Sequence, residues 1–303
     1  MNAQSRPRTS DSGIRILLQE ACKEVGIPVV DAELLREGEN TIFRLPGRVV
    51  VRISRRGQEA VARKEIAVSR WLEANNLSAV RVLPEVGRQP VIVEGRAVTF
   101  WQELPGHRHG TPGEVAKALH ALHALPPPRH FELGPLSPMA RLRERIEAAT
   151  TLDASDRQWL RSQVDALSVR YDGLAENLST TVVHGDAWGG NVVVTEDGET
   201  VLIDLERCSV GPREWDLVST AIKYSSFDWI TRSDYVEFVD VYGYDVAAWS
   251  GFEVLRDIRE LRMACYVAQQ AASQNKWADE ARTRVQCLRG LYGPRPWLWR
   301  PAL

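Results

Sequence analysis

The residues best suited to chemistry form a short polar constellation in the second half of the chain. Asp186 and Asn191 are five positions apart in the segment His184–Asn191 (HGDAWGGN), and Asp204 follows thirteen positions later, after an apolar run. Between them Glu196–Glu199 (EDGE) predicts a hairpin turn, which folds Asp204 back beside Asn191. We therefore expect one loop and one hairpin to bring three oxygen-bearing side chains together.

This trio meets the needs of phosphoryl transfer from a nucleoside triphosphate. Asn191 and Asp204 offer the hard oxygen ligands that Mg²⁺ requires, and the metal neutralises the phosphates. Asp186 is the carboxylate that orients an acceptor hydroxyl and takes its proton. The spacing of Asp186 and Asn191 is that of the base and the metal-binding asparagine in a protein-kinase catalytic loop. The alternative, turn residues that only cap a β-turn-β segment, does not require this coordinated spacing.

The elements that position these residues follow from apolar periodicity. In the first third, helices are expected at Ile14–Val25 and Gln58–Ala74, with strands at Glu33–Glu37, Thr41–Leu45, Val49–Ile53, Val91–Val93 and Ala97–Glu103. After Leu104-Pro105-Gly106 helical spacing dominates, at Pro112–Leu125, Met139–Thr150, Asp156–Leu174, Glu214–Ser225, Ser233–Tyr242 and Phe252–Ser273.

A β-rich part followed by a larger helical part with one embedded hairpin predicts an α+β fold of the bilobal, protein-kinase-like kind. We predict a flexible tail at 1–12, a nucleotide-binding N-terminal lobe at 13–104, and a catalytic and acceptor-binding C-terminal lobe at 105–303. A cleft between two such lobes is where a nucleotide would bind.

The composition of the chain limits the kinds of partner that it is expected to bind. The 303 residues carry a net charge of -2, so no basic excess exists to hold nucleic acid or an anionic membrane. The four cysteines form no CxxC pair, which argues against a metal cluster or a disulfide framework. The polar residues 1–12 do not form a signal peptide, so we expect a cytoplasmic protein with a small-molecule partner. The oligomeric state is left open.

The pattern HGDxxxxN followed by IDxE (Ile203–Glu206) resembles that of the aminoglycoside phosphotransferase and choline kinase superfamily. Within it, HGDAWGGN is similar to the HGDxWxGN form of ketosamine kinases. The resemblance is specific between Thr181 and Leu217, and the order of elements agrees along nearly the whole chain. It implies an ATP-dependent, Mg²⁺-dependent small-molecule kinase, although the sequence leaves ATP versus GTP open.

The resemblance implies roles for residues of the first lobe. Arg52 takes the strand position where such kinases place a basic residue against the α- and β-phosphates, and Glu65 on the next helix is its candidate ion-pair partner. Many kinases use Lys there, but a guanidinium also suits phosphate. Gly38 and Asn40 lie where the loop over the phosphates is expected. For Arg52, Glu65 and this loop, a solvent-facing residue or a plain turn is the alternative.

Other implied roles concern the nucleotide base and the frame of the site. Gln102, Glu103 and Leu104 end the last strand of the first lobe, where backbone groups would bind adenine. Glu206 is the acidic residue of IDxE and a candidate near a second metal. His184 is expected to brace the catalytic loop, and Asp216 to accept hydrogen bonds from its amides. Neither is expected to do chemistry.

The acceptor is less defined. Acidic residues outnumber basic ones in the segment 223–260, which suits a cationic antibiotic, yet Arg256, Arg259 and Arg262 recur at helical spacing and suit an acceptor with carboxylate or carbonyl groups. We predict phosphorylation of a hydroxyl, on an antibiotic (an aminoglycoside, a nucleoside or a similar compound) in a resistance role. The alternatives are a metabolic kinase of an amino sugar, ketosamine, choline-like amine or homoserine-like alcohol, and a nucleotide-binding module without turnover.

Overall fold

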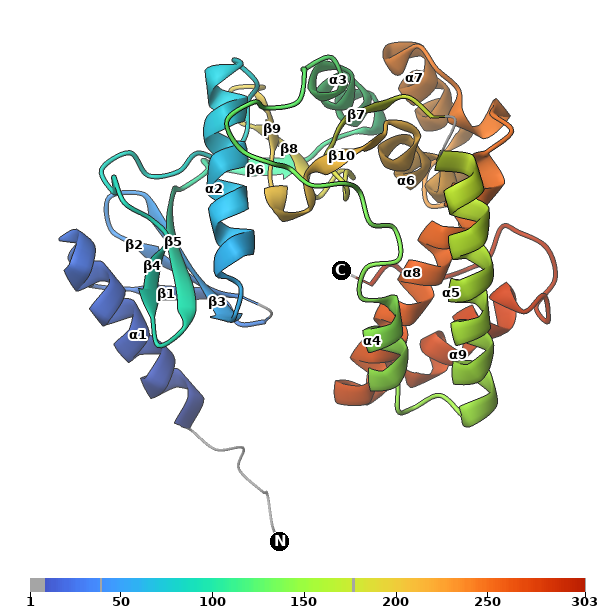
Figure 1. Ribbon diagram of the computed structural model, residues 1–303, viewed down its shortest axis with the longest axis horizontal. Helices are drawn as coiled ribbons and strands as arrows, with labels where there is room; N and C mark the ends of the chain where they lie inside the picture. Colours follow the sequence, from blue (N-terminus) through green and yellow to red (C-terminus); the bar gives the residue numbers. More distant parts are fainter. Residues whose placement is uncertain (1–8, 39, 176–177, 303) are drawn as a thin grey trace, which may run out of the picture. The chain divides into compact units, whose positions relative to one another are not determined.

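The computed structural model of the chain describes residues 9–38, 40–175 and 178–302 (Figure 1). Contacts between residues divide the chain into two compact units. Unit 1 comprises Met1–Arg108, Pro128–Leu133 and Val193–Cys208, and unit 2 comprises His109–Pro127, Gly134–Val192 and Ser209–Leu303. The segment 193–208 therefore belongs with the first unit, although it lies within the predicted lobe 105–303.

Unit 1 is built on a five-stranded antiparallel sheet of order β1-β2-β3-β5-β4. Its strands are β1 (Glu33–Arg36), β2 (Thr41–Leu45), β3 (Val49–Arg56), β5 (Arg96–Gln102) and β4 (Val91–Val93). In the turns between β2 and β3 and between β4 and β5, Gly47 and Gly95 take positive φ values of 79° and 73°, which glycine adopts without strain. In the register of the central strand, Val51 lies opposite both Phe43 and Phe100.

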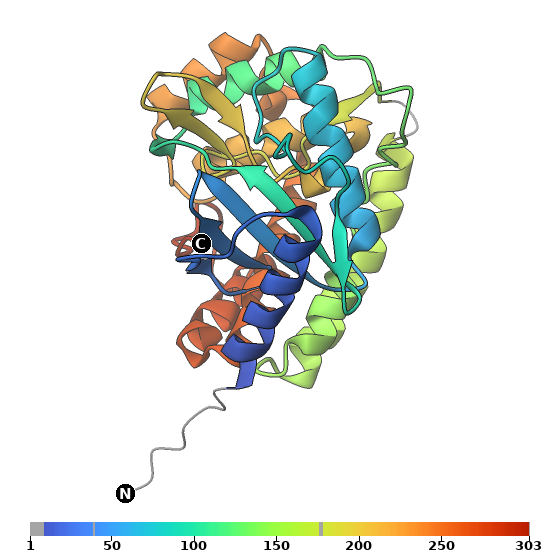
Figure 2. The same ribbon diagram turned by 90° about the vertical axis from the view of Figure 1, so that its left-hand side faces the viewer.

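Alternation along β3 divides its side chains between two faces. Val51 and Ile53 are buried with Phe43 and Phe100 under the apolar side of α1 (Thr9–Val25) (Figure 2). Val50 and Arg52 lie on the opposite face, since successive residues of a strand point to opposite sides. The helix α2 (Glu59–Ala74) packs there through an apolar cluster that includes Ile66, Val82 and Trp101. The alternation of side chains along β3 therefore points Arg52 toward α2.

The hairpin that carries Asp204 is bound into unit 1 through its backbone. The strands β8 (Val192–Thr195) and β9 (Thr200–Leu202) form a sheet of order β6-β8-β9 with β6 (His107–His109), and a short 3₁₀ turn, η1 (Leu205–Arg207), follows. Leu202 accepts from the amide of Val80 at 2.9 Å and donates to the carbonyl of Ser78 at 3.0 Å. The residues after β9 are therefore held against the segment that follows α2.

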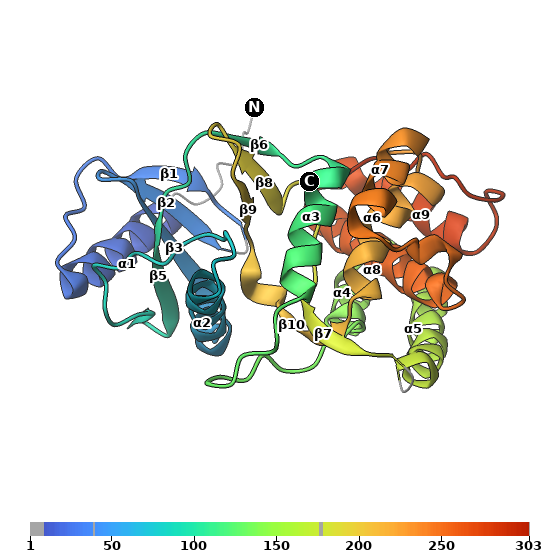
Figure 3. The same ribbon diagram turned by 90° about the horizontal axis from the view of Figure 1, so that it is seen from above.

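Unit 2 is mostly helical and is centred on a long helix, α8, that packs against α4, α5, α6 and α9 (Figure 3). The helices are α3 (Pro112–His123), α4 (Leu142–Ala148), α5 (Ala154–Ala175), α6 (Glu214–Ser225), α7 (Arg232–Tyr242), α8 (Phe252–Ser273) and α9 (Ala278–Leu288), with short turns η2 (Val246–Ala248) and η3 (Asn275–Trp277). Two antiparallel strands, β7 (Thr180–Val183) and β10 (Ser209–Pro212), pair in register from Val183↔Ser209 to Thr180↔Pro212.

Most predicted elements are present, and the differences have physical reasons. The helices 214–225 and 252–273 have the predicted bounds. Residues 9–12 belong to α1 and not to a tail, whereas residues 1–8 lie outside the described residues. The helix α9 was not predicted because its buried face contains the charged pair Glu280 and Arg284, which weakens the apolar period. No helix in the described parts of the chain is long and apolar enough to cross a membrane.

Aromatic residues near the C-terminus pack within unit 2. Trp299 is only 2% exposed, and its ring centroid lies 4.7 Å from that of Phe227 and 5.4 Å from that of Trp297. The guanidinium of Arg284 lies 4.8 Å from the centre of the Trp299 ring. This cluster ties Trp297 and Trp299 to Phe227, just after α6, and to Arg284 on α9.

We expect Trp299→Ala to lower the free energy of unfolding by about 3–5 kcal/mol, since it leaves a cavity in a packed aromatic cluster. Urea unfolding followed by circular dichroism measures this loss. Leu298→Ala is the matched control, because Leu298 is adjacent to Trp299 in sequence but 90% exposed, so its loss should change stability by less than about 0.5 kcal/mol. Equal losses of stability in the two variants would contradict the role of Trp299 in packing this cluster.

Candidate active site

Arg52 is the centre of a charged cluster in unit 1. Its Nη1 atom donates to both carboxylate oxygens of Glu65, each at 2.8 Å, and Glu65 is buried at the inner side of α2. This is the ion pair expected from the sequence, and it excludes a solvent-facing arrangement for either residue. It follows from the strand alternation that points Arg52 toward α2.

The same guanidinium also reaches the segment after β9. Its Nη2 atom donates to Glu206 Oε2 at 2.8 Å. With its amide oxygen turned toward the guanidinium, Asn40 accepts from Nη2 at 2.6 Å and from Nε at 3.0 Å. Arg52 therefore joins the loop between β1 and β2, the helix α2 and the 3₁₀ turn η1.

Negative charge exceeds positive charge in this cluster. Burial alone would lower the pKa of Arg52, but the carboxylates of Glu65, Glu206 and Asp204 outweigh it and hold that pKa above its ordinary value. Burial raises the pKa of Glu65 to about 7, Arg52 opposes the rise, and the charges of Asp204 and Glu206 add to it. One guanidinium therefore faces three acidic side chains, of which Glu65 is partly protonated near neutral pH.

Asp204 has an unusual backbone conformation at the point where the hairpin ends. Its φ and ψ are 59° and 58°, in the left-handed region that residues other than glycine seldom adopt. Asp and Asn tolerate this region best, at a cost of about 1–2 kcal/mol. Six other non-glycine residues of the described chain also have positive φ values, so this conformation alone assigns no function to Asp204.

The loop predicted to be catalytic lies in unit 2, between β7 and β8, and is fixed by its own hydrogen bonds. Asn191 Nδ2 donates to the carbonyl oxygen of Asp186 at 2.9 Å, and the amide of Asn191 donates to Trp188 O at 2.8 Å. Gly185 has a φ of 86° that suits only glycine. A Cβ at Gly190 would come within 2.3 Å of the Trp188 ring. Since Nδ2 is engaged, the amide oxygen of Asn191 is the atom left to meet a cation.

Asp216 anchors this loop from the first turn of α6. Its Oδ2 accepts from the amide of His184 at 2.7 Å, and its Oδ1 accepts from the amide of Gly185 at 2.9 Å. His123 Nε2 lies 3.1 Å from Oδ2, and its other ring nitrogen lies 2.8 Å from the hydroxyl of Tyr242. The hydrogen bonds expected between Asp216 and the loop amides are thus present.

The Asp216 carboxylate is fully buried but remains ionised. Burial would raise its pKa, yet the hydrogen bond from His123 and the charges of His123, His184 and Arg259 outweigh that effect and lower the pKa. A buried carboxylate held by two backbone amides is a rigid support for the residue that follows them in the chain, Asp186.

Arg259 and Lys223 are basic side chains that interact electrostatically with Asp186. Arg259 Nη1 lies 3.8 Å from Asp186 Oδ1, while its Nη2 donates to Trp215 O at 2.8 Å and Gly185 O at 3.3 Å. Lys223 on α6 lies with its Nζ 5.1 Å from the centre of the Trp188 ring. Burial lowers the pKa of Lys223 to about 8, and the Asp186 carboxylate opposes that shift.

The remaining predicted residues are placed as follows. The amides of Gln102 and Glu103 donate to Arg81 O and Arg48 O, at 2.9 and 2.8 Å, so these two donors are already engaged. Leu104 follows them outside any strand. A Cβ at Gly38 would meet only ordinary contacts, so the backbone does not require glycine there. Contact with a nucleotide stays a prediction for Gly38, Gln102, Glu103 and Leu104.

The three arginines of α8 are held within unit 2. Arg256 pairs with Glu253 and Asp257, and Arg262 donates to the carbonyl oxygens of Pro138 and Ala140 at 2.6 and 3.2 Å. Arg259 lies 3.8 Å from the Asp186 carboxylate, and these contacts of Arg256 and Arg262 lie elsewhere in unit 2.

His123 and Lys223 carry no sequence signal that would mark either of them as a site residue. His123 comes from α3 and meets Asp216 across 93 positions, and Lys223 meets Trp188 across 35. No motif marks either residue, because the contacts arise from tertiary packing. The IDxE residue Glu206 was noted as a candidate near a metal, and the structure shows it bound by Arg52.

The predicted residues fall into two sets. Arg52, Glu65, Asn40 and Glu206 are brought together in unit 1, which also contains Asp204. Asp186 and Asn191 are brought together in unit 2. No three His, Cys, Asp or Glu side chains converge as metal ligands in the part of the chain that the structure describes. The predicted Mg²⁺ ligands include an asparagine, and their joint role stays a prediction.

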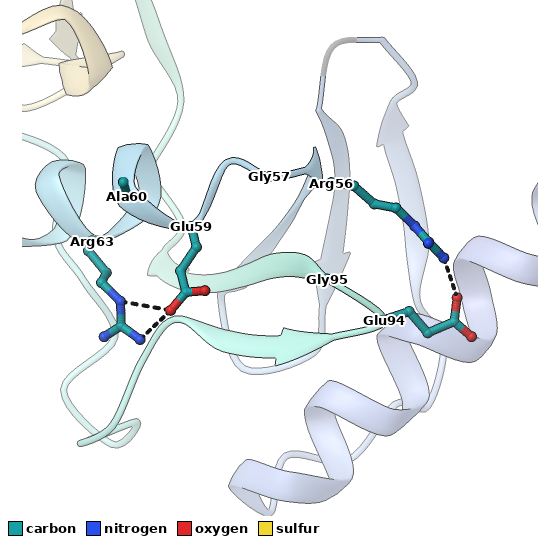
Figure 4. A pocket seen from close by; sticks show the side chains of 7 residues that line it. All are labelled: Arg56, Gly57, Glu59, Ala60, Arg63, Glu94 and Gly95. Carbon is teal, nitrogen blue, oxygen red and sulfur yellow. Dashed lines mark hydrogen bonds and ion pairs between the residues drawn. The ribbon is translucent and has the colours of Figure 1, made fainter.

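A surface hollow of about 700 Å³ lies elsewhere on unit 1, between the start of α2 and the β4–β5 turn (Figure 4). Its two arginines are paired with carboxylates, Arg63 with Glu59 and Arg56 with Glu94. It contains none of the predicted site residues, and its charges are mutually satisfied.

Comparison with known proteins identifies the class. Residues 33–258 match the sequence model of the phosphotransferase enzyme family, and the chain therefore belongs to that family. This confirms the resemblance on which the site assignment was based, and with it a small-molecule phosphotransferase as the class of enzyme. No curated protein sequence matches the chain significantly.

Solved structures share the fold. The choline kinase LicA from Streptococcus pneumoniae, also solved with AMP, is 15% identical with a TM-score of 0.65, over 92% of this chain and 99% of that one. The aminoglycoside phosphotransferase APH(3'')-Id from Streptomyces rimosus, also solved with ADP and streptomycin, is 19% identical with a TM-score of 0.60, over 82% and 98%. The amicoumacin kinase hAmiN, solved with AMP-PNP and Ca²⁺, is 12% identical with a TM-score of 0.63, over 90% and 96%. At these identities the likeness establishes the fold, which confirms the predicted α+β, protein-kinase-like class.

We expect Asp216→Asn to lower the free energy of unfolding by about 2–3 kcal/mol at pH 7, because one charged acceptor of two buried amides is lost. Since the pKa of Asp216 is lowered by folding, its contribution is present above the unfolded value of about 3.9 and is lost as the pH falls through the folded value. The difference between the wild type and Asp216→Asn should therefore shrink below about pH 4.

Urea unfolding at a series of pH values measures this difference. The exposed Asp240→Asn on α7 is the matched control and should stay within about 0.5 kcal/mol of the wild type. A difference between wild type and Asp216→Asn that stays constant down to acid pH would argue against an ionised, hydrogen-bonded carboxylate at position 216.

Proposed function

We propose that the chain is an ATP-dependent O-phosphotransferase that moves the γ-phosphoryl group to a hydroxyl of a small molecule. The observation that carries the proposal is the fixed catalytic loop, in which Asp216 holds the backbone that presents Asp186. The family match and the relatives solved with adenine nucleotides support ATP as the donor.

In this reaction the acceptor hydroxyl oxygen forms a bond to the γ-phosphorus while the bond from that phosphorus to the β–γ bridging oxygen breaks. ADP leaves with the electron pair of the broken bond. Asp186 orients the hydroxyl and accepts its proton, which then passes to solvent. Arg259, 3.8 Å from the Asp186 carboxylate, keeps that side chain oriented.

Mg²⁺ is the metal we propose, with Asn191 and Asp204 as its protein ligands. The donor set fits a hard cation, since it consists of an amide oxygen and a carboxylate, and the excess of carboxylates around Arg52 adds attraction. When bound, Mg²⁺ neutralises the phosphates of the nucleotide. Arg52, pre-oriented by Glu65 and Glu206, is proposed to contact the phosphates.

The acceptor classes expected from the sequence differ in the charge that they carry. A resistance enzyme for an aminoglycoside needs a site for several amino groups, whereas the basic residues bordering Asp186 in unit 2 are Arg259 and Lys223. This favours the metabolic alternative, or a less cationic antibiotic, over a polycationic one. Asp186 and Asn191, held by an ordered loop, favour an enzyme over a nucleotide-binding module without turnover.

We expect Asp186→Asn to reduce alcohol-stimulated ADP release by at least about 100-fold, because the general base is lost while ATP binding is kept. A coupled assay with a panel of alcohols measures turnover, and calorimetry with ATP and Mg²⁺ measures binding. Retention of alcohol-stimulated release in Asp186→Asn would remove the base assignment. Stimulation by no alcohol in the wild type, with ATP still bound, would instead favour the binding module.

For the metal, we expect Asp204→Ala to abolish Mg²⁺-dependent turnover, since it removes a carboxylate ligand. Asp197→Ala, in the exposed turn of the same hairpin, is the matched control and should keep turnover and Mg²⁺ dependence. A titration of activity against Mg²⁺ compares the variants. An unchanged Mg²⁺ response in Asp204→Ala would overturn the ligand assignment.

Expression in a sensitive host tests the resistance role. Tolerance to an antibiotic that is lost in Asp186→Asn would establish detoxification, and growth that is unchanged across several antibiotic classes would favour the metabolic alternative.

A further inference from the structure

Lys223 is a basic residue near Asp186 that the reaction described above does not use. It lies on α6 with its ammonium over the Trp188 ring, at 5.1 Å from the centroid, and both side chains are half-buried. Trp188 follows Asp186 by two positions in the catalytic loop, and His109 meets the same indole edge to face at 5.7 Å. Lys223 and Trp188 therefore form one continuous surface near the Asp186 carboxylate.

The ammonium lacks the partners that a half-buried cation normally has. Across residues 9–38, 40–175 and 178–302, no carboxylate lies within ion-pair distance of Lys223 Nζ, and no oxygen accepts a hydrogen bond from it. Its interactions are the indole face and the more distant field of Asp186. An ammonium has three donors, and leaving them unmade away from water is unfavourable.

Burial has a measurable consequence for this group. It lowers the pKa of Lys223 to about 8, against the effect of Asp186, so the side chain is still mostly protonated at neutral pH. An anionic oxygen brought to Nζ would relieve the cost of burial and strengthen the charge.

The other charged groups beside Asp186 are already engaged. Arg259 donates to the carbonyl oxygens of Gly185 and Trp215 and lies 3.9 Å from the centre of the Trp215 ring. The carboxylate of Asp216 is taken by two amides and His123. Of Arg259 and Lys223, Lys223 is therefore the one whose charge is available to bind a ligand.

We propose that Lys223 is a specificity-determining residue that binds a carboxylate on the acceptor alcohol, with the Trp188 ring as the surface against which the acceptor packs. The inference rests on the proposed function and narrows it, since the substrate becomes a hydroxy acid or sugar acid. A polycationic acceptor would place its ammonium groups against Lys223 and Arg259 and be repelled.

A different role for Lys223 must be separated from this one. If the ammonium only stabilised the Asp186 carboxylate, its loss would change kcat for every acceptor alike. If it binds the acceptor, its loss raises KM for carboxylated acceptors and leaves neutral ones nearly unchanged.

The experiment measures ADP release by the full chain with ATP and Mg²⁺ and three sets of alcohols: hydroxy acids (glycerate, gluconate), neutral polyols (glycerol, glucose) and cationic alcohols (choline, kanamycin). We expect the wild type to prefer the hydroxy acids. In Lys223→Met, which keeps an aliphatic side chain against Trp188, KM for the preferred hydroxy acid should rise about 10- to 100-fold, with kcat changed less than about threefold. Lys223→Glu should lose hydroxy acids more completely.

Lys276→Met is the matched control. Lys276 also lies over an indole, 5.4 Å from the centre of the Trp277 ring, but it is exposed and outside the candidate site, so its KM and kcat should equal those of the wild type. Circular dichroism of each variant verifies folding.

The outcomes separate the two proposals. Preference for a cationic or neutral alcohol, or an unchanged KM for the hydroxy acid in a folded Lys223→Met, would overturn the role of Lys223 while the phosphotransferase remained. An equal loss of kcat for all acceptors would also overturn it, in favour of support for Asp186. Release stimulated by no alcohol would remove the proposed function, and this inference with it.

Discussion

The site depends on one buried interaction, the pair of hydrogen bonds from the amides of His184 and Gly185 to the carboxylate of Asp216. A charged acceptor in the interior is stable only when its oxygens are satisfied, and here two amides and an imidazole satisfy them. These hydrogen bonds offset the cost of burying the charge, and they fix the backbone of the loop at His184 and Gly185. Asp186 follows Gly185 in the chain, so these hydrogen bonds also fix the position of its backbone.

A second charged centre, around Arg52, organises unit 1 in a comparable way. A single guanidinium connects a strand, a helix and the segment after the β8–β9 hairpin through Glu65 and Glu206. Its carboxylate partners outnumber it, and this excess of negative charge is the basis on which we propose that Asp204 binds Mg²⁺.

Much of this could be predicted from the sequence, because the informative residues are close together along the chain. The spacing of Asp186 and Asn191 and the turn at 196–199 depend on local rules, and the pleat of β3 fixes which way Arg52 points. The residues that sequence reasoning missed make contacts across long separations. His123 reaches Asp216 from another helix, Lys223 reaches Trp188 from α6, and the buried charges of α9 hide its helical period.

The most direct measurement of the central claim follows the phosphorus atom itself. The chain is incubated with γ-³²P-labelled ATP, Mg²⁺ and an alcohol that stimulates ADP release, and the products are separated. We expect the label in the alcohol, as a phosphate monoester formed in equal amount to ADP. Label found only in inorganic phosphate, or retained in ATP, would contradict transfer to a hydroxyl.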